Sequence, residues 1–184
     1  NTFDFGSGLI FFEESNKPFS RHTRKIIKSN NNPFILRKQD HNIILGSSII
    51  LGSNIIKEGI RFDEKIGLGT YYGGSEETDI FLTIIEKGYK CIFFPNIIFS
   101  HIELSKTHYN FGKMLSYGLG RGYTYRKHLE NDYLFYIYNL IKSLLNNFLG
   151  FIYYLSILKC NNSLIQLGLF IGKIIGFLKI KYKQ

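Results

Sequence analysis

The sequence predicts an α/β domain with a mixed sheet, followed by two or three apolar helices. Short apolar runs at 42–51 and 90–94, each bounded by turn residues, predict buried strands. Between them, the apolar residues that follow Ser75 recur at helical spacing. The last part of the chain is strongly apolar over 133–158 and 164–182. With 184 residues, the chain is long enough for one domain with a real core and an appendage.

The charge distribution divides the chain into two predicted domains. Residues 1–103 carry 12 Lys and Arg against 12 Asp and Glu, whereas residues 104–184 carry 11 against 2, so the net charge of +9 belongs to the second part. Cys91 and Cys160 are too few for a disulfide framework or a cysteine metal site, which fits a reducing compartment. The chain shows no secretory leader and starts at Asn1 rather than Met, so we expect a fragment.

The first 60 residues predict two strands and two short helical or irregular segments. Residues 1–12 and 42–51 are the expected strands, and small residues in the middle of the second suggest that another group approaches it closely. We expect a helix or loop at 21–29 and a short helix at 55–59. A basic cluster could steer a diphosphate, although such clusters are more often a solvated face: Arg21, His22, Arg24, Lys25 and Lys28.

A glycine-rich loop delivers three carboxylates to the start of the helix that follows Ser75. Ser75 is a good N-cap, and acidic residues in a first turn are stabilised by the helix dipole, so the acids have an ordinary structural explanation. That explanation does not account for the glycines, which cost chain entropy unless the backbone or a ligand requires them. Both interpretations therefore stay open for Gly67, Gly69, Gly73 and Gly74 and for Glu76, Glu77 and Asp79.

Past this helix, the pattern predicts a helix stop and two short strands. Gly88 is a plausible C-terminal stop. The run at 90–94 is closed by Pro95, and residues 97–99 predict a second strand that ends before His101.

The order of these motifs resembles the C-terminal half of the nucleotide-sugar-binding domain of family 2 glycosyltransferases, which have the GT-A fold. Six motifs in one order over about forty residues are more specific than any one of them. The likeness covers roughly residues 40–130, including Tyr117–Gly122 and Arg126–His128. The matching motifs are Phe62-Asp63-Glu64, Gly67-Leu68-Gly69, Glu76-Glu77-Thr78-Asp79, Gly88-Tyr89-Lys90, Pro95 and His101.

The resemblance implies inverting transfer of a sugar from a nucleotide-sugar donor to a hydroxyl of a glycan or lipid-linked acceptor, in cell-envelope polysaccharide synthesis. Glu77 stands where the family has its catalytic base, and His101 where many GT-A enzymes have a late ligand of Mg²⁺ or Mn²⁺. Such a cation prefers oxygen ligands, so histidine alone would not hold it. The residues expected to bind substrate are Glu76, Asp79, Asp63, Ser48 and Arg121.

Two departures from the family pattern limit this expectation. Gly52-Ser53 stands where the family often has two arginines. No Asp-x-Asp metal motif occurs among these residues, so we expect the donor-binding half to be missing and the chain alone to be inactive. The alternating glycines at 118, 120 and 122 permit close helix packing or backbone approach to a ligand; a phosphate-cradling loop is disfavoured because no strand precedes them.

The basic tail predicts attachment to a membrane. Because Lys142, Asn146, Asn147 and Lys173 interrupt the apolar segments, we expect amphipathic helices on an anionic, cytoplasmic membrane surface rather than a span. The alternative is a helical appendage packed on the catalytic domain. A competing function is a non-catalytic membrane-surface module with the acidic loop as scaffold. Nucleic-acid binding ranks lower, because the positive charge lies among apolar segments.

Overall fold

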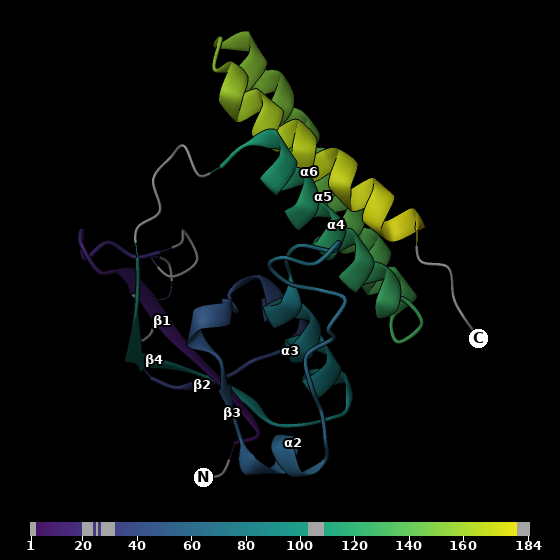
Figure 1. The fold of residues 1–184 in the computed structure, drawn as a ribbon. Helices are drawn as coiled ribbons and strands as arrows, with labels where there is room; N and C mark the ends of the chain where they lie inside the picture. The colour runs from purple at the N-terminus through teal and green to yellow at the C-terminus, as the bar shows by residue number, and fades with distance from the viewer. Residues whose placement is uncertain (1–2, 20–23, 25, 27–31, 103–108, 180–184) are drawn as a thin grey trace. The chain divides into compact units, whose positions relative to one another are not determined.

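The computed structural model describes residues 3–19, 24, 26, 32–102 and 109–179, and all structural statements concern these residues. The fold is mixed α/β (Figure 1). The chain forms two compact units, which we call the sheet unit (1–62 and 77–105) and the helical unit (63–76 and 106–184). Our boundary after residue 103 lies close to this division, but the acidic loop 63–76 groups with the helices.

The sheet unit contains a mixed sheet of four strands in the order β2-β4-β1-β3. The two long strands, β1 (Phe5–Phe12) and β4 (Cys91–His101), run parallel in its centre. The two edge strands, β2 (Phe34–Ile35) and β3 (Ile50–Leu51), are short and antiparallel to their neighbours. The predicted first strand and the mixed sheet are confirmed.

Strand β4 runs straight through Pro95, so the prediction of two separate strands at 90–94 and 97–99 was wrong. The register shifts at this point: Gly8 pairs with Phe94, but Leu9 pairs with Ile98. The irregularity accommodates Pro95, which has no N–H to give to a ladder. It also requires Gly8, because a Cβ there would lie 2.5 Å from Ile97 O.

The predicted strand at 42–51 is also wrong for most of its length. Residues Lys38–Asn42 and Gly46–Ser48 form the 3₁₀ helices η1 and η2, and only β3 is extended. The Ser48 hydroxyl donates to Leu45 O at 3.0 Å, which stabilises the turn against the strand that the flanking isoleucines favour. Helix α2 (Ser53–Lys57) starts two residues before the predicted one.

Helix α3 (Glu76–Glu86) is the predicted helix after Ser75. Its side chains Ile80, Phe81 and Ile84 are fully buried, and the Phe81 ring lies 5.4 Å from that of Phe5. Gly88 follows with φ 84°, the left-handed conformation expected of a C-terminal stop. The segment and basic cluster predicted around 21–29 lie mostly outside the described residues.

The helical unit contains α4 (Phe111–Lys127), α5 (Tyr133–Ser156) and α6 (Cys160–Leu178), which pack side by side (Figure 1). Glycines bring the backbones of α4 and α6 into contact: a Cβ on Gly118 would lie 2.7 Å from Leu169 O, and one on Gly176 would lie 2.1 Å from Leu119 O. Close helix packing therefore accounts for glycine at 118.

Among the described helices, α6 is long and apolar enough to cross a membrane. Cores of soluble proteins contain helices of the same kind, so length and composition alone do not assign α6 to a membrane.

Candidate carboxylate site

The acidic loop 63–76 is folded by its own hydrogen bonds. Gly67 N donates to Tyr72 O at 2.9 Å, and the Thr70 hydroxyl donates to Lys65 O and Gly67 O, each at 2.9 Å. Gly67 and Gly69 have φ of 127° and 87°, which explains why the loop needs glycine at these positions.

Two further glycines let the loop dock on α4. A Cβ on Gly120 would lie 1.8 Å from Gly74 O, and a Cβ on Gly73 would lie 1.9 Å from the Ser116 hydroxyl. The Tyr72 ring packs on the Tyr123 ring with their centres 4.2 Å apart. The alternating glycines of α4 thus serve two faces, since Gly118 faces α6 and Gly120 faces the loop.

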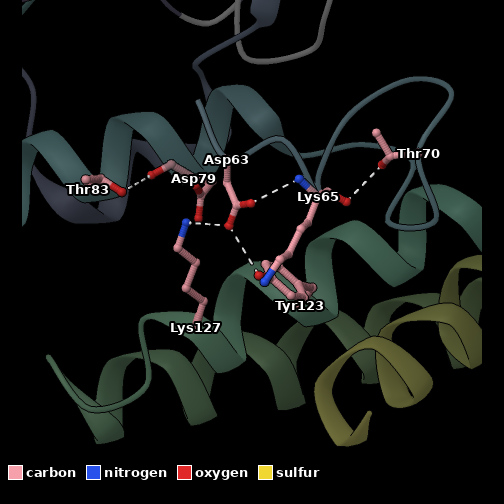
Figure 2. Close-up of polar contacts among 7 residues, drawn as sticks. All are labelled: Asp63, Lys65, Thr70, Asp79, Thr83, Tyr123 and Lys127. Atoms are coloured by element: carbon pink, nitrogen blue, oxygen red, sulfur yellow. Dashed lines mark hydrogen bonds and ion pairs between the residues drawn. The ribbon is translucent and has the colours of Figure 1, made fainter. Parts of the chain in front are cut away.

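At the start of the loop, Asp63 is held by three donors (Figure 2). Lys127 Nζ lies 2.9 Å and Tyr123 Oη 3.2 Å from Asp63 Oδ2, and the Lys65 N–H donates to Oδ1 at 3.0 Å. Partial burial acts to raise the pKa of Asp63, but the hydrogen bonds and the Lys127 charge outweigh it and lower the pKa below its usual value. Asp63 is therefore an ionised anchor for the loop.

At the other end of the loop, Glu76 has a buried carboxylate oxygen. Its Oε2 is shielded from solvent and has no hydrogen-bond partner among the described residues. A Cβ on Gly67 would lie 3.8 Å from this oxygen, so glycine leaves room beside it. The preceding Ser75 has φ 79° instead of the extended backbone usual for an N-cap. A buried acceptor without a partner, next to a residue with positive φ, is uncommon and makes Glu76 a candidate functional position.

Glu77 and Asp79 lie in the first turn of α3. Glu77 is half-buried. Asp79 is only 1 % exposed, and its main-chain oxygen accepts a 2.9 Å hydrogen bond from the Thr83 hydroxyl (Figure 2). The burial of Asp79 favours a bracing role over direct contact with an acceptor.

The remaining predicted residues lie apart from this loop in the chain. Ser48 is fully buried, and its hydroxyl shares a 2.8 Å hydrogen bond with the Ser7 hydroxyl. Arg121 lies on α4 with its guanidinium 5.9 Å from the centre of the Tyr125 ring. His101 ends β4, where its Nδ1 lies 2.7 Å from Ile102 O.

The structure brings Asp63 together with two residues that the sequence did not single out as a pair. Tyr123 and Lys127 stand four residues apart on α4, so they share one helix face. That spacing was visible in the sequence, but their partner lies sixty residues upstream and no local pattern predicts the contact.

His101, the expected metal ligand, has no cluster of further ligands around it in the part of the chain that the structure describes. Among the described residues, no group of three or more His, Cys, Asp or Glu side chains is placed to hold an ion. His101 stands as a single imidazole, which is insufficient for Mg²⁺ or Mn²⁺.

Comparisons with known proteins give no relative: no family model, curated protein or solved structure matches the chain. The observed class is therefore a small mixed α/β fold joined to a helical bundle.

Proposed function

We propose that this chain is the later part of an inverting family 2 glycosyltransferase with a GT-A fold. One observation carries the proposal: the six motifs from Phe62-Asp63-Glu64 to His101 stand in the family's order. The fold is compatible with it, since α3 begins with Glu76 and Glu77 and leads to a strand parallel to β1.

The reaction proposed is a single displacement. The Glu77 carboxylate takes the proton of the acceptor hydroxyl, whose oxygen attacks the anomeric carbon of the donor sugar. The bond from this carbon to the diphosphate breaks, and the diphosphate leaves with the electron pair. A carboxylate within hydrogen-bond reach of the acceptor hydroxyl can serve as this base.

The other residues would position the substrates. Asp63, clamped by Lys127 and Tyr123, fixes the start of the loop. Glu76 remains a proposed substrate contact, but its Oε2 is shielded from solvent, so this oxygen can meet a sugar hydroxyl only if the loop shifts. Asp79 braces α3 from within, while Ser48 and Arg121 remain proposed substrate contacts.

For the divalent cation of the family, the described residues supply no complete ligand set, so a cation beside His101 remains a proposal. A cation beside His101 would need oxygen ligands from outside the described residues. No step of the proposed mechanism therefore passes through a metal.

The second candidate function is a non-catalytic module on the cytoplasmic membrane surface. It is favoured by the apolar side chains that α5 exposes, and by the absence of acidic residues after Asp132. Both candidate functions involve a membrane, but only the glycosyltransferase requires turnover of a nucleotide sugar. In either case the proposed partner is an anionic membrane surface, which basic residues approach favourably.

A transfer assay separates these candidates. The chain is expressed together with any upstream portion of its reading frame and supplied with a panel of nucleotide sugars and membrane-extracted acceptors. Release of nucleoside diphosphate that depends on the acceptor supports the glycosyltransferase. Vesicle binding with no nucleotide-sugar binding or turnover on any member of the panel supports the module instead.

A further inference from the structure

The hairpin formed by α5 and α6 holds several polar side chains between its two helices, whereas Asn146, Ser156, Lys159 and Asn161 are exposed in or near its turn. Along α5, the side chain of Asn147 is 8 % exposed, and its amide donates to Gln166 Oε1 of α6 at 2.6 Å. Ser163 of α6 is 2 % exposed and donates to Phe151 O at 3.1 Å. Gly150 packs directly against the Gln166 side chain.

Most of the exposed side chains of the same segment are large and apolar. Leu149 is 63 % exposed and Leu158, in the turn between the helices, is 84 % exposed. We call residues 145–164 the hairpin tip; its exposed apolar side chains are Leu145, Phe148, Leu149, Ile152, Tyr153, Leu155, Ile157, Leu158 and Leu164.

Helix α4 does not cover the tip. It starts at Phe111, whose carbonyl oxygen would lie 2.7 Å from a Cβ on Gly168, so its contact with α6 begins after the tip has ended. Figure 1 shows α5 and α6 extending together past the start of α4. Residues 149–156 alone project about 12 Å at the helical rise of 1.5 Å per residue.

We infer that the hairpin tip inserts, turn first, into one leaflet of a lipid bilayer. In water, a helix pair buries its apolar stripe, whereas this tip buries the polar Asn147 and Ser163 between its helices and exposes large apolar side chains. Small residues and side-chain hydrogen bonds between helices, with apolar residues outward, are typical of helices surrounded by lipid. The inference deepens the membrane association proposed above and rests on it, but it does not rest on sugar transfer.

Charge favours lipid over a second protein as the occupant. No acidic residue follows Asp132, whereas six lysines do: Lys142, Lys159, Lys173, Lys179, Lys181 and Lys183. Lys142 is exposed on α5 before the tip, and Lys159 is exposed in the turn itself, where its long stem has to carry the ammonium back to the headgroups. An insertion depth of about 5–10 Å is usual for such interfacial segments and is within the projection of the tip.

Cys160 gives a native probe of insertion. It is exposed in the first turn of α6, while Cys91, the only other cysteine, is buried in β4. The full chain is mixed with vesicles of phosphatidylcholine containing phosphatidylglycerol and treated with a bulky, water-soluble maleimide. Insertion predicts that Cys160 reacts in the absence of vesicles, is shielded on vesicles, and stays shielded in high salt.

A pair of variants tests the surface itself. Leu149→Asp should reduce vesicle binding about tenfold or more. Leu68→Asp, a 71 % exposed leucine in the acidic loop, should leave it unchanged. Both positions are exposed, so a merely structural effect would not separate them.

Other results would overturn the inference in distinguishable ways. Binding that is lost in high salt, with Cys160 reactive throughout, would leave surface association standing and remove insertion. A dimer in solution whose tip is shielded without lipid would show that a second copy covers this face. Failure to bind any vesicle would remove the membrane association as well.

Discussion

Lys127 Nζ lies 2.9 Å from Asp63 Oδ2, which ties the first residue of the acidic loop to the last turn of α4. Both residues belong to motifs on which the family resemblance depends. The ion pair joins these two motifs, which are distant in the sequence, and fixes the start of the loop that leads to Glu76.

Asp63→Asn should destabilise the helical unit modestly and at neutral pH only. The folded-state pKa of Asp63 is lowered, so its stabilisation is present above the unfolded pKa of about 4 and is lost as the pH falls through the folded value. Because the ion pair is partly exposed, we expect about 0.5–1 kcal/mol at pH 7. Urea unfolding at pH 7 and pH 2.5 checks this prediction. An equal loss of unfolding free energy at both pH values would show that the ion pair between Asp63 and Lys127 does not stabilise the unit. Lys127→Met should reproduce the effect.

Gly120→Ala should detach the acidic loop from α4. Its Cβ would lie 1.8 Å from Gly74 O, a main-chain atom that cannot move without shifting the loop. We expect a loss of about 2 kcal/mol or more, by analogy with overpacked cores. Gly112→Ala is the matched control on the same helix, because the nearest atom to its Cβ is 3.6 Å away and alanine favours helix. A thermal unfolding temperature of Gly120→Ala above that of wild type would contradict the docking of the acidic loop on α4.

The stability of the helical unit should rise with pH through Lys173. Its ammonium is buried and donates to Ser143 Oγ at 2.5 Å; burial, and secondarily the charge of Arg121, lower its pKa to about 7. The unfolded chain, with a lysine pKa of about 10.4, binds more protons between these values, so the free energy of unfolding rises with pH there. The slope from this group is at most about 1.4 kcal/mol per pH unit. Lys173→Met should flatten the dependence of the unfolding free energy on pH. An unchanged slope would show that Lys173 is not its cause.

Glu76→Gln should weaken substrate binding without lowering stability. The buried Oε2 has no hydrogen-bond partner among the described residues, so the substitution removes no protein hydrogen bond to this oxygen. The unfolding temperature measured by calorimetry should be unchanged or higher than that of wild type. Titration with the nucleotide sugar that is turned over should show weaker binding. A large loss of stability would instead assign Glu76 a purely structural role.

Local patterns predicted the elements whose residues pack against their own neighbours. The apolar spacing after Ser75 gave α3, the Gly88 stop was correct, and the apolar tail forms α5 and α6. The prediction of a strand at 42–51 was wrong because the Ser48 hydroxyl bonds across the sheet unit to the Ser7 hydroxyl, forty-one residues away. Pro95 was predicted to end a strand, but β4 continues through it because the pairing with β1 shifts its register after Gly8.

The candidate site was predictable only in part. The sequence indicated Asp63 and Glu76, and the glycines that the loop backbone needs at Gly67 and Gly69. It did not indicate the clamp from Tyr123 and Lys127, because long-range contacts leave no local periodicity. It also did not reveal that Asn147, Ser163 and Lys173 are buried in the tail, since apolar composition alone does not say which face is covered.

The most direct test of the proposed chemistry compares Glu77→Gln with Glu86→Gln in the chain carrying any upstream portion of its reading frame. Both glutamates lie on α3, at opposite ends of the helix. If Glu77 is the base, Glu77→Gln abolishes acceptor-dependent release of nucleoside diphosphate, leaves nucleotide-sugar binding nearly intact, and Glu86→Gln turns over at the wild-type rate. Retained turnover in Glu77→Gln would contradict the proposal and remove this residue from the mechanism.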